Sequence, residues 1–346
     1  MNTVETYLKF AERPNTRRSY AAAVRHFEQE WRGLLPATPD SIARYLADQA
    51  TAVAINTLRL RLAGLSRWHS DHGFADPTKT KLVTQVLKGI RAAHSAPEKQ
   101  AKPLELMQLQ QVVDWLELSP PGASEDARIH RLRQTRDRAM LLMGFWRGFR
   151  ADELTSLKVE NITVEQAVGM SIFLPRSKGD RESEGRRYQC PALSRLCPVA
   201  AYEAWIATAG ITEGPVFRKI DRWGNLRGEA MAAGSVIPWL RQLFQVAGVT
   251  EPERYSSHSL RRGFAGWART SGWDLKALME YVGWKDVNAA MRYLDTAADD
   301  LQAKFERGLA PLPDGGGERK PPSGKASLSA TLSTPPSGRP SLKVVR

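Results

Sequence analysis

The chain has 346 residues, 42% hydrophobic and 25% charged, which is typical of a globular protein with room for two domains of ordinary size. The longest apolar run covers only 139–146, which argues against a membrane-spanning helix. Two cysteines are too few for a disulfide scaffold, and the first residues mix charged with apolar side chains, which argues against a secretory signal. A net charge of +13 indicates a polyanionic partner, because Lys and Arg side chains that neutralise phosphates release condensed counterions.

Residues 1–93 are predicted to form a small helical domain. Apolar residues recur at helical spacing in four stretches, which cover 11–31, 35–50, 55–73 and 76–94. A charged helix face is usually only solvated, but basic residues on several helices of one small domain favour a surface that binds DNA. The candidates for DNA contact are Arg59, Arg61, Arg67, Lys88 and Arg91.

The pattern changes after an exposed linker at 94–103, and residues 104–309 are predicted to form a mixed domain. Helices are expected at 106–117, 133–147, 151–158, 197–209 and 233–247, and again over most of 259–309. Three short strands are expected at 160–166, 169–175 and 185–191, with 177–185 as the tip of a long hairpin. Residues 310–346 are rich in Pro, Gly and Ser, and this composition predicts a disordered basic tail.

Several polar residues of this mixed domain could carry chemistry. Arg150 stands at a predicted helix start with Glu153 one turn later, and in isolation the two are most simply a surface ion pair. His258 and Arg261 are three positions apart, which places a proton-transfer group beside a forked cation on one helical face, a pairing that suits a phosphate. Lys178 lies on the hairpin tip, where most lysines are merely solvated.

Taken together, these motifs are far more specific than any of them alone. Lys178 follows Arg150 by 28 positions, Trp284 follows His258 by 26, and Tyr293 follows Trp284 by nine. This order and spacing resemble the tyrosine recombinase, or phage integrase, family, in its Cre/Xer-like branch. The resemblance covers roughly 1–309, is sharp in the mixed domain, and is absent from the tail.

The resemblance implies a mainly α-helical fold with a small antiparallel sheet in the catalytic domain, arranged as a two-domain clamp around DNA. It implies a site-specific recombinase that cleaves and rejoins DNA through a 3′-phosphotyrosyl intermediate, without a metal ion or other cofactor. The implied catalytic residues are Arg150, Lys178, His258, Arg261, Trp284 and the nucleophile Tyr293, with Glu153 as a supporting residue.

Trp284 departs from the commonest family pattern, in which a second histidine occupies this position. No histidine follows His258 in the chain, so a shift in register cannot supply one. An indole N–H donates one hydrogen bond but does not exchange a proton. Trp284 is therefore expected to contact and orient the phosphate, while His258 and Lys178 move protons.

The resemblance also implies the partners. The DNA partner is a double-stranded recombination site, and in some systems there is also an accessory DNA-binding protein. Two protomers occupy each site, and a homotetramer forms on synapsed DNA. The implied location is the cytoplasm, at the bacterial nucleoid. Integration, excision and resolution of a mobile element or replicon remain open as biological roles. Two other interpretations remain, a type IB topoisomerase-like enzyme that relaxes DNA and a non-catalytic DNA-binding protein of the same fold. A helix expected at 296–309 is compatible with docking on its own chain or on a neighbour.

Overall fold

Two compact units make up the chain, residues 1–100 (the helical unit) and residues 101–346 (the larger unit). The computed structural model describes residues 13–94, 100–121, 126–176, 184–291 and 293. The predicted hairpin tip, the helix expected at 296–309 and the predicted tail lie wholly or largely outside the described residues. The division after Gln100 falls within 94–103, the predicted linker.

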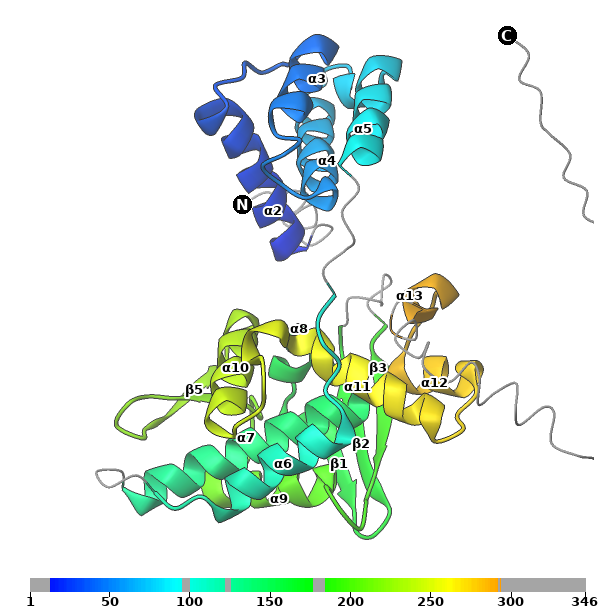
Figure 1. The fold of residues 1–346 in the computed structure, drawn as a ribbon. Helices are drawn as coiled ribbons and strands as arrows, with labels where there is room; N and C mark the ends of the chain where they lie inside the picture. The colour runs from blue at the N-terminus through cyan, green and yellow to red at the C-terminus, as the bar shows by residue number, and fades with distance from the viewer. Residues whose placement is uncertain (1–12, 95–99, 122–125, 177–183, 292, 294–346) are drawn as a thin grey trace, which may run out of the picture. The chain divides into compact units, whose positions relative to one another are not determined.

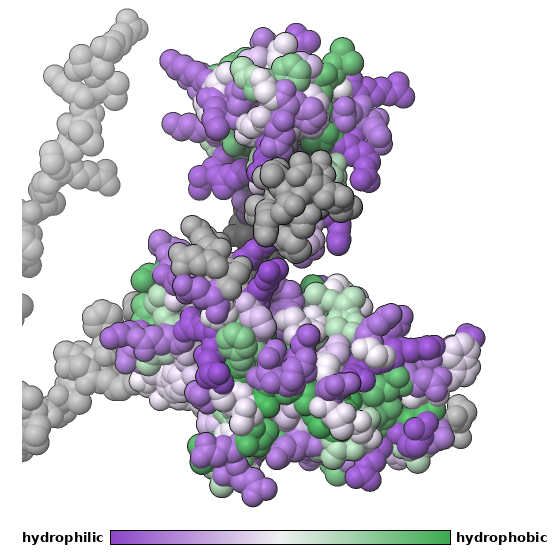
Figure 2. Space-filling model, turned by 180° about the vertical axis from the view of Figure 1, so that it is seen from behind, coloured by the Kyte–Doolittle hydropathy of each residue, from purple (hydrophilic) through white to green (hydrophobic). Residues whose placement is uncertain are grey.

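The described residues of the helical unit, 13–94 and 100, contain four α-helices, one in each stretch where helical spacing predicted one (Figure 1). They are α2 (Pro14–Arg25), extended by a π-helical turn η1 (His26–Glu30), then α3 (Pro39–Asp48), α4 (Ile55–Asp71) and α5 (Lys81–Ala93), with a 3-10 turn η2 (Pro77–Lys79) before α5. Phe27 and Tyr45 meet edge to face at 5.1 Å in the core. Hydrophilic residues cover most of the face of this unit seen in Figure 2.

The larger unit is a helical bundle with a three-stranded sheet at one end (Figure 1). Helix α7 (Ala127–Arg147) is its buried centre and packs against α6 (Leu106–Leu118), α9 (Pro198–Ala209) and α11 (Ser257–Thr270). The remaining elements are α8 (Ala151–Thr155), η3 (Val159–Asn161), η4 (Ala233–Ser235), α10 (Val236–Val246), η5 (Pro252–Arg254), α12 (Leu275–Val282) and α13 (Val287–Met291). No helix among the described residues is long and apolar enough to span a membrane.

The predicted strands form an antiparallel sheet in the order β1 (Ile162–Glu165), β2 (Gly169–Leu174) and β3 (Arg186–Pro191). Ile172 pairs with Ile162 on one side and with Tyr188 on the other, so that the apolar residues share the face toward the core. On β3, Arg186, Tyr188 and Cys190 face inward in turn, whereas Arg187 points away.

Three details differ from the sequence prediction. Helix α7 begins at Ala127, six positions earlier than expected, because Asp126 caps it by accepting a hydrogen bond from the Arg128 N–H at 2.7 Å. Helix α8 ends at Thr155, because the Ser156 hydroxyl donates to the Glu153 carbonyl and competes with a further helical turn. A second antiparallel pair, β4 (Arg218–Ile220) and β5 (Leu226–Ala230), was not predicted, since its residues lack alternating hydrophobicity.

Candidate active site

The first predicted catalytic arginine lies in the turn between α7 and α8. Helix α7 ends at Arg147 and is capped by Gly148, whose positive φ of 57° is the left-handed conformation that terminates a helix. Arg150 then occupies the N-cap of α8. The Glu153 carboxylate, 4% exposed, accepts hydrogen bonds from the Arg150 backbone N–H at 2.9 Å and from Arg150 Nη1 at 2.6 Å. One buried carboxylate therefore fixes both the backbone and the side chain of Arg150.

The predicted His–Arg pair lies in the first turn of α11. The Ser256 hydroxyl caps this helix by accepting a hydrogen bond from the His258 N–H at 3.2 Å. Arg261 is 1% exposed and donates to the Gly148 carbonyl at 2.9 Å and to the Val282 carbonyl at 3.3 Å. Arg261 therefore joins three segments that lie far apart in the sequence.

Arg261 also shares the carboxylate that holds Arg150. Its Nη1 lies 3.6 Å from Glu153 Oε2. Burial and the neighbouring Arg150 cation lower the pKa of Arg261 to about 10, while Glu153 opposes the shift. A guanidinium with that pKa stays protonated at neutral pH, so two cations face the same small region of the site.

Tyr293 lies beside this cationic cluster. Its hydroxyl is 3.1 Å from His258 Nδ1, and its ring stacks on Trp284 with centroids 5.1 Å apart. The Arg261 guanidinium lies 5.3 Å from the Trp284 ring centroid and 5.8 Å from that of Tyr293. Helix α13 ends at Met291, so Tyr293 lies in the turn after the helix, with its N–H bonded to the Ala290 carbonyl at 2.9 Å.

Two N–H donors in the cluster lack an acceptor within the described part of the chain. They are Nε of Arg261 and Nε1 of Trp284, and both are buried. A buried donor without an acceptor is costly, and in a native protein it often marks the place of a missing ligand or water. The Tyr293 ring stacks on the Trp284 ring and lies near the Arg261 guanidinium, so both donors belong to side chains that contact the predicted nucleophile.

Six of the predicted site residues thus converge in the larger unit. They are Arg150, Glu153, His258, Arg261, Trp284 and Tyr293. Lys178 lies outside the described residues. The convergence is a matter of position, and the chemical role of each residue remains a prediction.

The predicted DNA-contacting residues lie on α4 and α5 of the helical unit. Arg59 donates to Asn56 at 3.4 Å, Arg61 donates to Gln49 at 2.9 Å, and Arg67 pairs with Asp71 at 2.7 Å. Lys88 and Arg91 are exposed. Their role in DNA binding stays a prediction.

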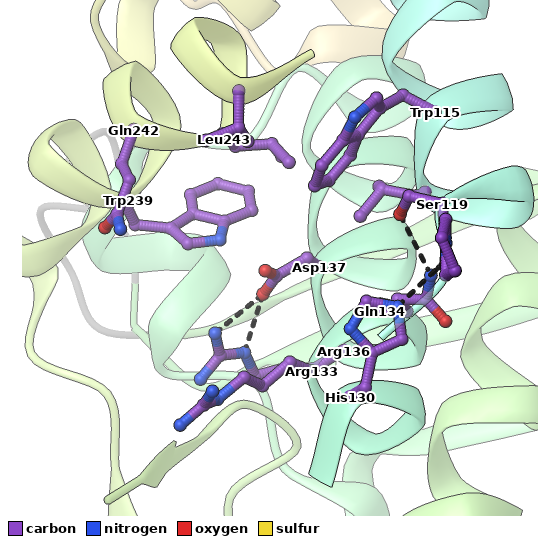
Figure 3. A pocket seen from close by; sticks show the side chains of 13 residues that line it. Trp115, Ser119, His130, Arg133, Gln134, Arg136, Asp137, Trp239, Gln242 and Leu243 are labelled. Atoms are coloured by element: carbon purple, nitrogen blue, oxygen red, sulfur yellow. Dashed lines mark hydrogen bonds and ion pairs between the residues drawn. The ribbon is translucent and has the colours of Figure 1, made fainter. Parts of the chain in front are cut away.

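The larger unit also contains a pocket of about 580 Å³ that includes none of the predicted site residues. It lies between α6, α7 and α10, with Trp115 and Trp239 on opposite walls (Figure 3). The Arg136–Asp137 ion pair, at 2.7 Å, also lines this pocket (Figure 3). The Tyr293 cluster is therefore a separate site, built from segments that converge on Arg261.

Replacing Glu153 by glutamine tests the electrostatic role of this carboxylate. We expect Glu153→Gln to lower the free energy of unfolding by roughly 3 kcal/mol, because a buried ion pair loses one partner and two arginines then face each other without a compensating charge. Chemical denaturation measures the change. Asp152→Asn, an exposed neighbour in the same helical turn, is the matched control and should change stability by less than about 0.5 kcal/mol. Equal losses of stability in both variants would show that the charge of Glu153 does not stabilise the fold more than that of an exposed carboxylate.

This fold and this cluster define a class of protein, and comparison with known families identifies it. Residues 123–299, just over half of the chain, match the phage integrase family. The chain belongs to this family, the tyrosine-type site-specific recombinases and integrases that act on DNA, and it is a DNA strand-exchange enzyme.

Individual relatives agree with this assignment. An integrase/recombinase XerD homologue of Selenomonas ruminantium is 29% identical over 297 residues, which is 83% of each chain. The Cre recombinase of Escherichia phage P1 is 26% identical over 293 residues, 80% of each chain.

Solved structures agree at the level of the fold. XerH bound to a palindromic difH substrate, in a post-cleavage complex, matches with a TM-score of 0.60 and 19% identity, covering 85% of this chain and 79% of that one. A lambda integrase dimer bound to a core site matches with a TM-score of 0.52 and 16% identity, over 86% and 95% of the two chains. The predicted tyrosine recombinase fold is confirmed.

Proposed function

We propose that the chain cleaves and rejoins DNA at a specific site with Tyr293 as nucleophile, forming a 3′-phosphotyrosyl bond and releasing a 5′-hydroxyl. The observation that carries this proposal is the 3.1 Å contact between the Tyr293 hydroxyl and His258 Nδ1 beside the buried Arg261. A covalent intermediate preserves the energy of the phosphodiester bond, so a 5′-hydroxyl from a second duplex can reverse the step and complete strand transfer.

His258 is the base that takes the proton from Tyr293. A phenol in water has a pKa of about 10 and is a weak nucleophile at neutral pH, so its proton must leave as the oxygen attacks phosphorus. The imidazole Nδ1 is within hydrogen-bond reach of the hydroxyl. Lys178, by resemblance to the family, protonates the departing 5′-oxygen.

The arginines stabilise charge in the transition state. Negative charge accumulates on the non-bridging oxygens as the phosphorus becomes five-coordinate, and fixed donors bind this state more strongly than the ground state. Arg150 is partly exposed at 23%, so it is accessible to a phosphate, while Arg261 Nε and Trp284 Nε1 are donors without acceptors among the described residues. Glu153 holds both guanidinium groups in place.

The same proposal extends to DNA binding and assembly. The basic faces of α4 and α5 contact the DNA backbone around a double-stranded recombination site, two protomers occupy each site, and a homotetramer forms when two sites synapse. The XerH and lambda integrase complexes, in which relatives are bound to their own DNA sites, support this part of the proposal. The biological role is integration, excision or resolution of a mobile element or replicon.

Covalent trapping on suicide DNA tests this function. Nicked duplexes that together cover the native flanking DNA should give a covalent protein–DNA adduct. Rejoining is prevented because the short cleaved fragment diffuses away. The adduct should survive denaturation of the protein and disappear on protease digestion. The phosphate should remain on the 3′ end of the upstream fragment, where it joins that fragment to the protein. An adduct at a 5′ phosphate would contradict the proposal. Relaxation of plasmids without any specific site, and without recombinant products, would instead indicate a topoisomerase.

A further inference from the structure

The carboxyl end of α12 is held by arginines from three different elements. Its last three carbonyl groups each accept a hydrogen bond from one guanidinium: Glu280 from Arg186 of β3 at 2.8 Å, Tyr281 from Arg147 of α7, and Val282 from Arg261 of α11 at 3.3 Å. The final carbonyls of a helix lack partners within the helix and form the negative end of its dipole. Three cations at one helix terminus therefore fix it strongly in position and direction.

This helix terminus continues directly into the site. Gly283 has a φ of 81° and closes the helix, and the N–H groups of Gly283 and Trp284 both donate to the Met279 carbonyl, at 2.8 and 2.9 Å. The backbone of Trp284 is thus part of the helix cap. A Cβ atom at Gly283 would approach Nη1 of Arg186 to 3.1 Å, so Arg186 packs closely against the same turn.

Arg147 is a buried cation that is held by carbonyl groups and aromatic rings. It is 2% exposed, and within the described residues it forms no ion pair with a carboxylate. Its guanidinium lies 3.8 Å from the Tyr281 ring centroid and 4.9 Å from that of Tyr188, and it donates to the Gln189 carbonyl at 3.1 Å. Burial raises the pKa of Tyr281 to about 12, so that phenol remains neutral beside the cation.

We propose that Arg147 and Arg186 are positioning residues for DNA cleavage, and this inference rests on the function proposed above. They hold the end of α12, and α12 sets the Trp284 indole against the Tyr293 ring and beside Arg261. Neither residue touches the reacting phosphate. Their effect on the reaction passes through Trp284, in contrast to Arg150 and Arg261, which contact the phosphate themselves.

Arg186 gives the clearest test because it is only partly buried, whereas Arg147 is 2% exposed. Arg186→Ala should slow single-turnover adduct formation by about 10- to 100-fold, the range expected when a catalytic group is displaced by about 1 Å. DNA affinity and the thermal midpoint should stay close to wild type. Arg186→Lys, which still donates one hydrogen bond, should recover part of the rate. Arg187→Ala is the matched control, because the adjacent arginine points away from α12 toward Ser171 and Phe173.

A double-mutant cycle separates positioning from a direct role. If Arg186 acts through Trp284, then Arg186→Ala combined with Trp284→Ala should be no slower than Trp284→Ala alone. Multiplicative losses would overturn the inference, as would a wild-type rate for Arg186→Ala. Arg147→Lys keeps the charge but loses the fork that reaches both Gln189 and Tyr281, and it should show the same non-additivity. A wild-type protein that forms no adduct would refute the proposed function itself, which is a distinct outcome.

Discussion

Tyr293→Phe is expected to abolish covalent adduct formation while DNA binding persists. Phenylalanine preserves the ring that stacks on Trp284 and lies near Arg261, but it removes the oxygen that we propose attacks phosphorus. No other group within the described site is placed to replace it, since the hydroxyl is the atom that meets His258 Nδ1. The adduct yield should fall by roughly 10⁴-fold or more, which is the scale seen when a nucleophile is deleted.

The measurement combines trapping on nicked suicide DNA with an electrophoretic mobility assay on the same duplex. Tyr202→Phe is the matched control, because Tyr202 is a buried tyrosine on α9 of the same unit, where burial raises its pKa to about 12. It should retain the wild-type adduct yield. Adduct from Tyr293→Phe at the wild-type level would assign the nucleophile to another residue. Loss of DNA binding in Tyr293→Phe would mean that the hydroxyl is needed before chemistry begins.

The sequence predicted elements that rest on local periodicity. The helices of both units follow from apolar residues spaced three or four positions apart, and strands β1 to β3 follow from apolar residues at every second position. The β4–β5 hairpin escaped prediction because it is built from polar residues around a turn. There the Asp221 carboxylate accepts from the N–H groups of Trp223 and Asn225, at 2.9 and 3.0 Å. This arrangement depends on side-chain hydrogen bonds and carries no hydrophobic pattern.

The identity of the site residues could be predicted from the sequence, but their arrangement in space could not. Arg150, His258, Arg261 and Tyr293 could be recognised because their order and spacing in the sequence resemble the pattern of the family. Their spatial convergence could not be deduced from helical spacing, since it depends on contacts between α7, α11 and the end of α12.

Arg147 and Arg186, two of the three arginines that hold α12, carried no sequence signal. Arg147 contacts a carbonyl 134 positions away, and Arg186 contacts one 94 positions away. Either residue, considered in the sequence alone, would be assigned to a solvated surface. Only the packing of α7 and β3 against α12 reveals that both donate to the helix end beside Trp284.

Arg261→Ala should be the most damaging arginine substitution in the site, because Arg261 has two tasks. In the proposed reaction it supplies charge and a donor toward the phosphate. It also bonds to the Gly148 and Val282 carbonyls, which fix the chain near Arg150 and Trp284. Removing the side chain leaves both carbonyls without this donor and withdraws one of the cations that compensates Glu153. Cleavage should slow by roughly 10³-fold or more, and the thermal midpoint should fall, while DNA binding through the helical unit persists.

Comparison with Arg261→Lys separates the two tasks. Lysine keeps the charge but cannot bond to Gly148 and Val282 at once in the forked geometry of a guanidinium, so its cleavage rate should lie between those of alanine and wild type. Arg269→Ala, an exposed position in the last turn of the same helix, controls for loss of one positive charge and should leave single-turnover cleavage nearly unchanged. If Arg261→Ala cleaved within about threefold of wild type, less than 1 kcal/mol in activation free energy, the phosphate would have to bind elsewhere. If lysine instead performed as well as arginine, charge alone would be sufficient, and the bonds to the two carbonyls would have no part in cleavage.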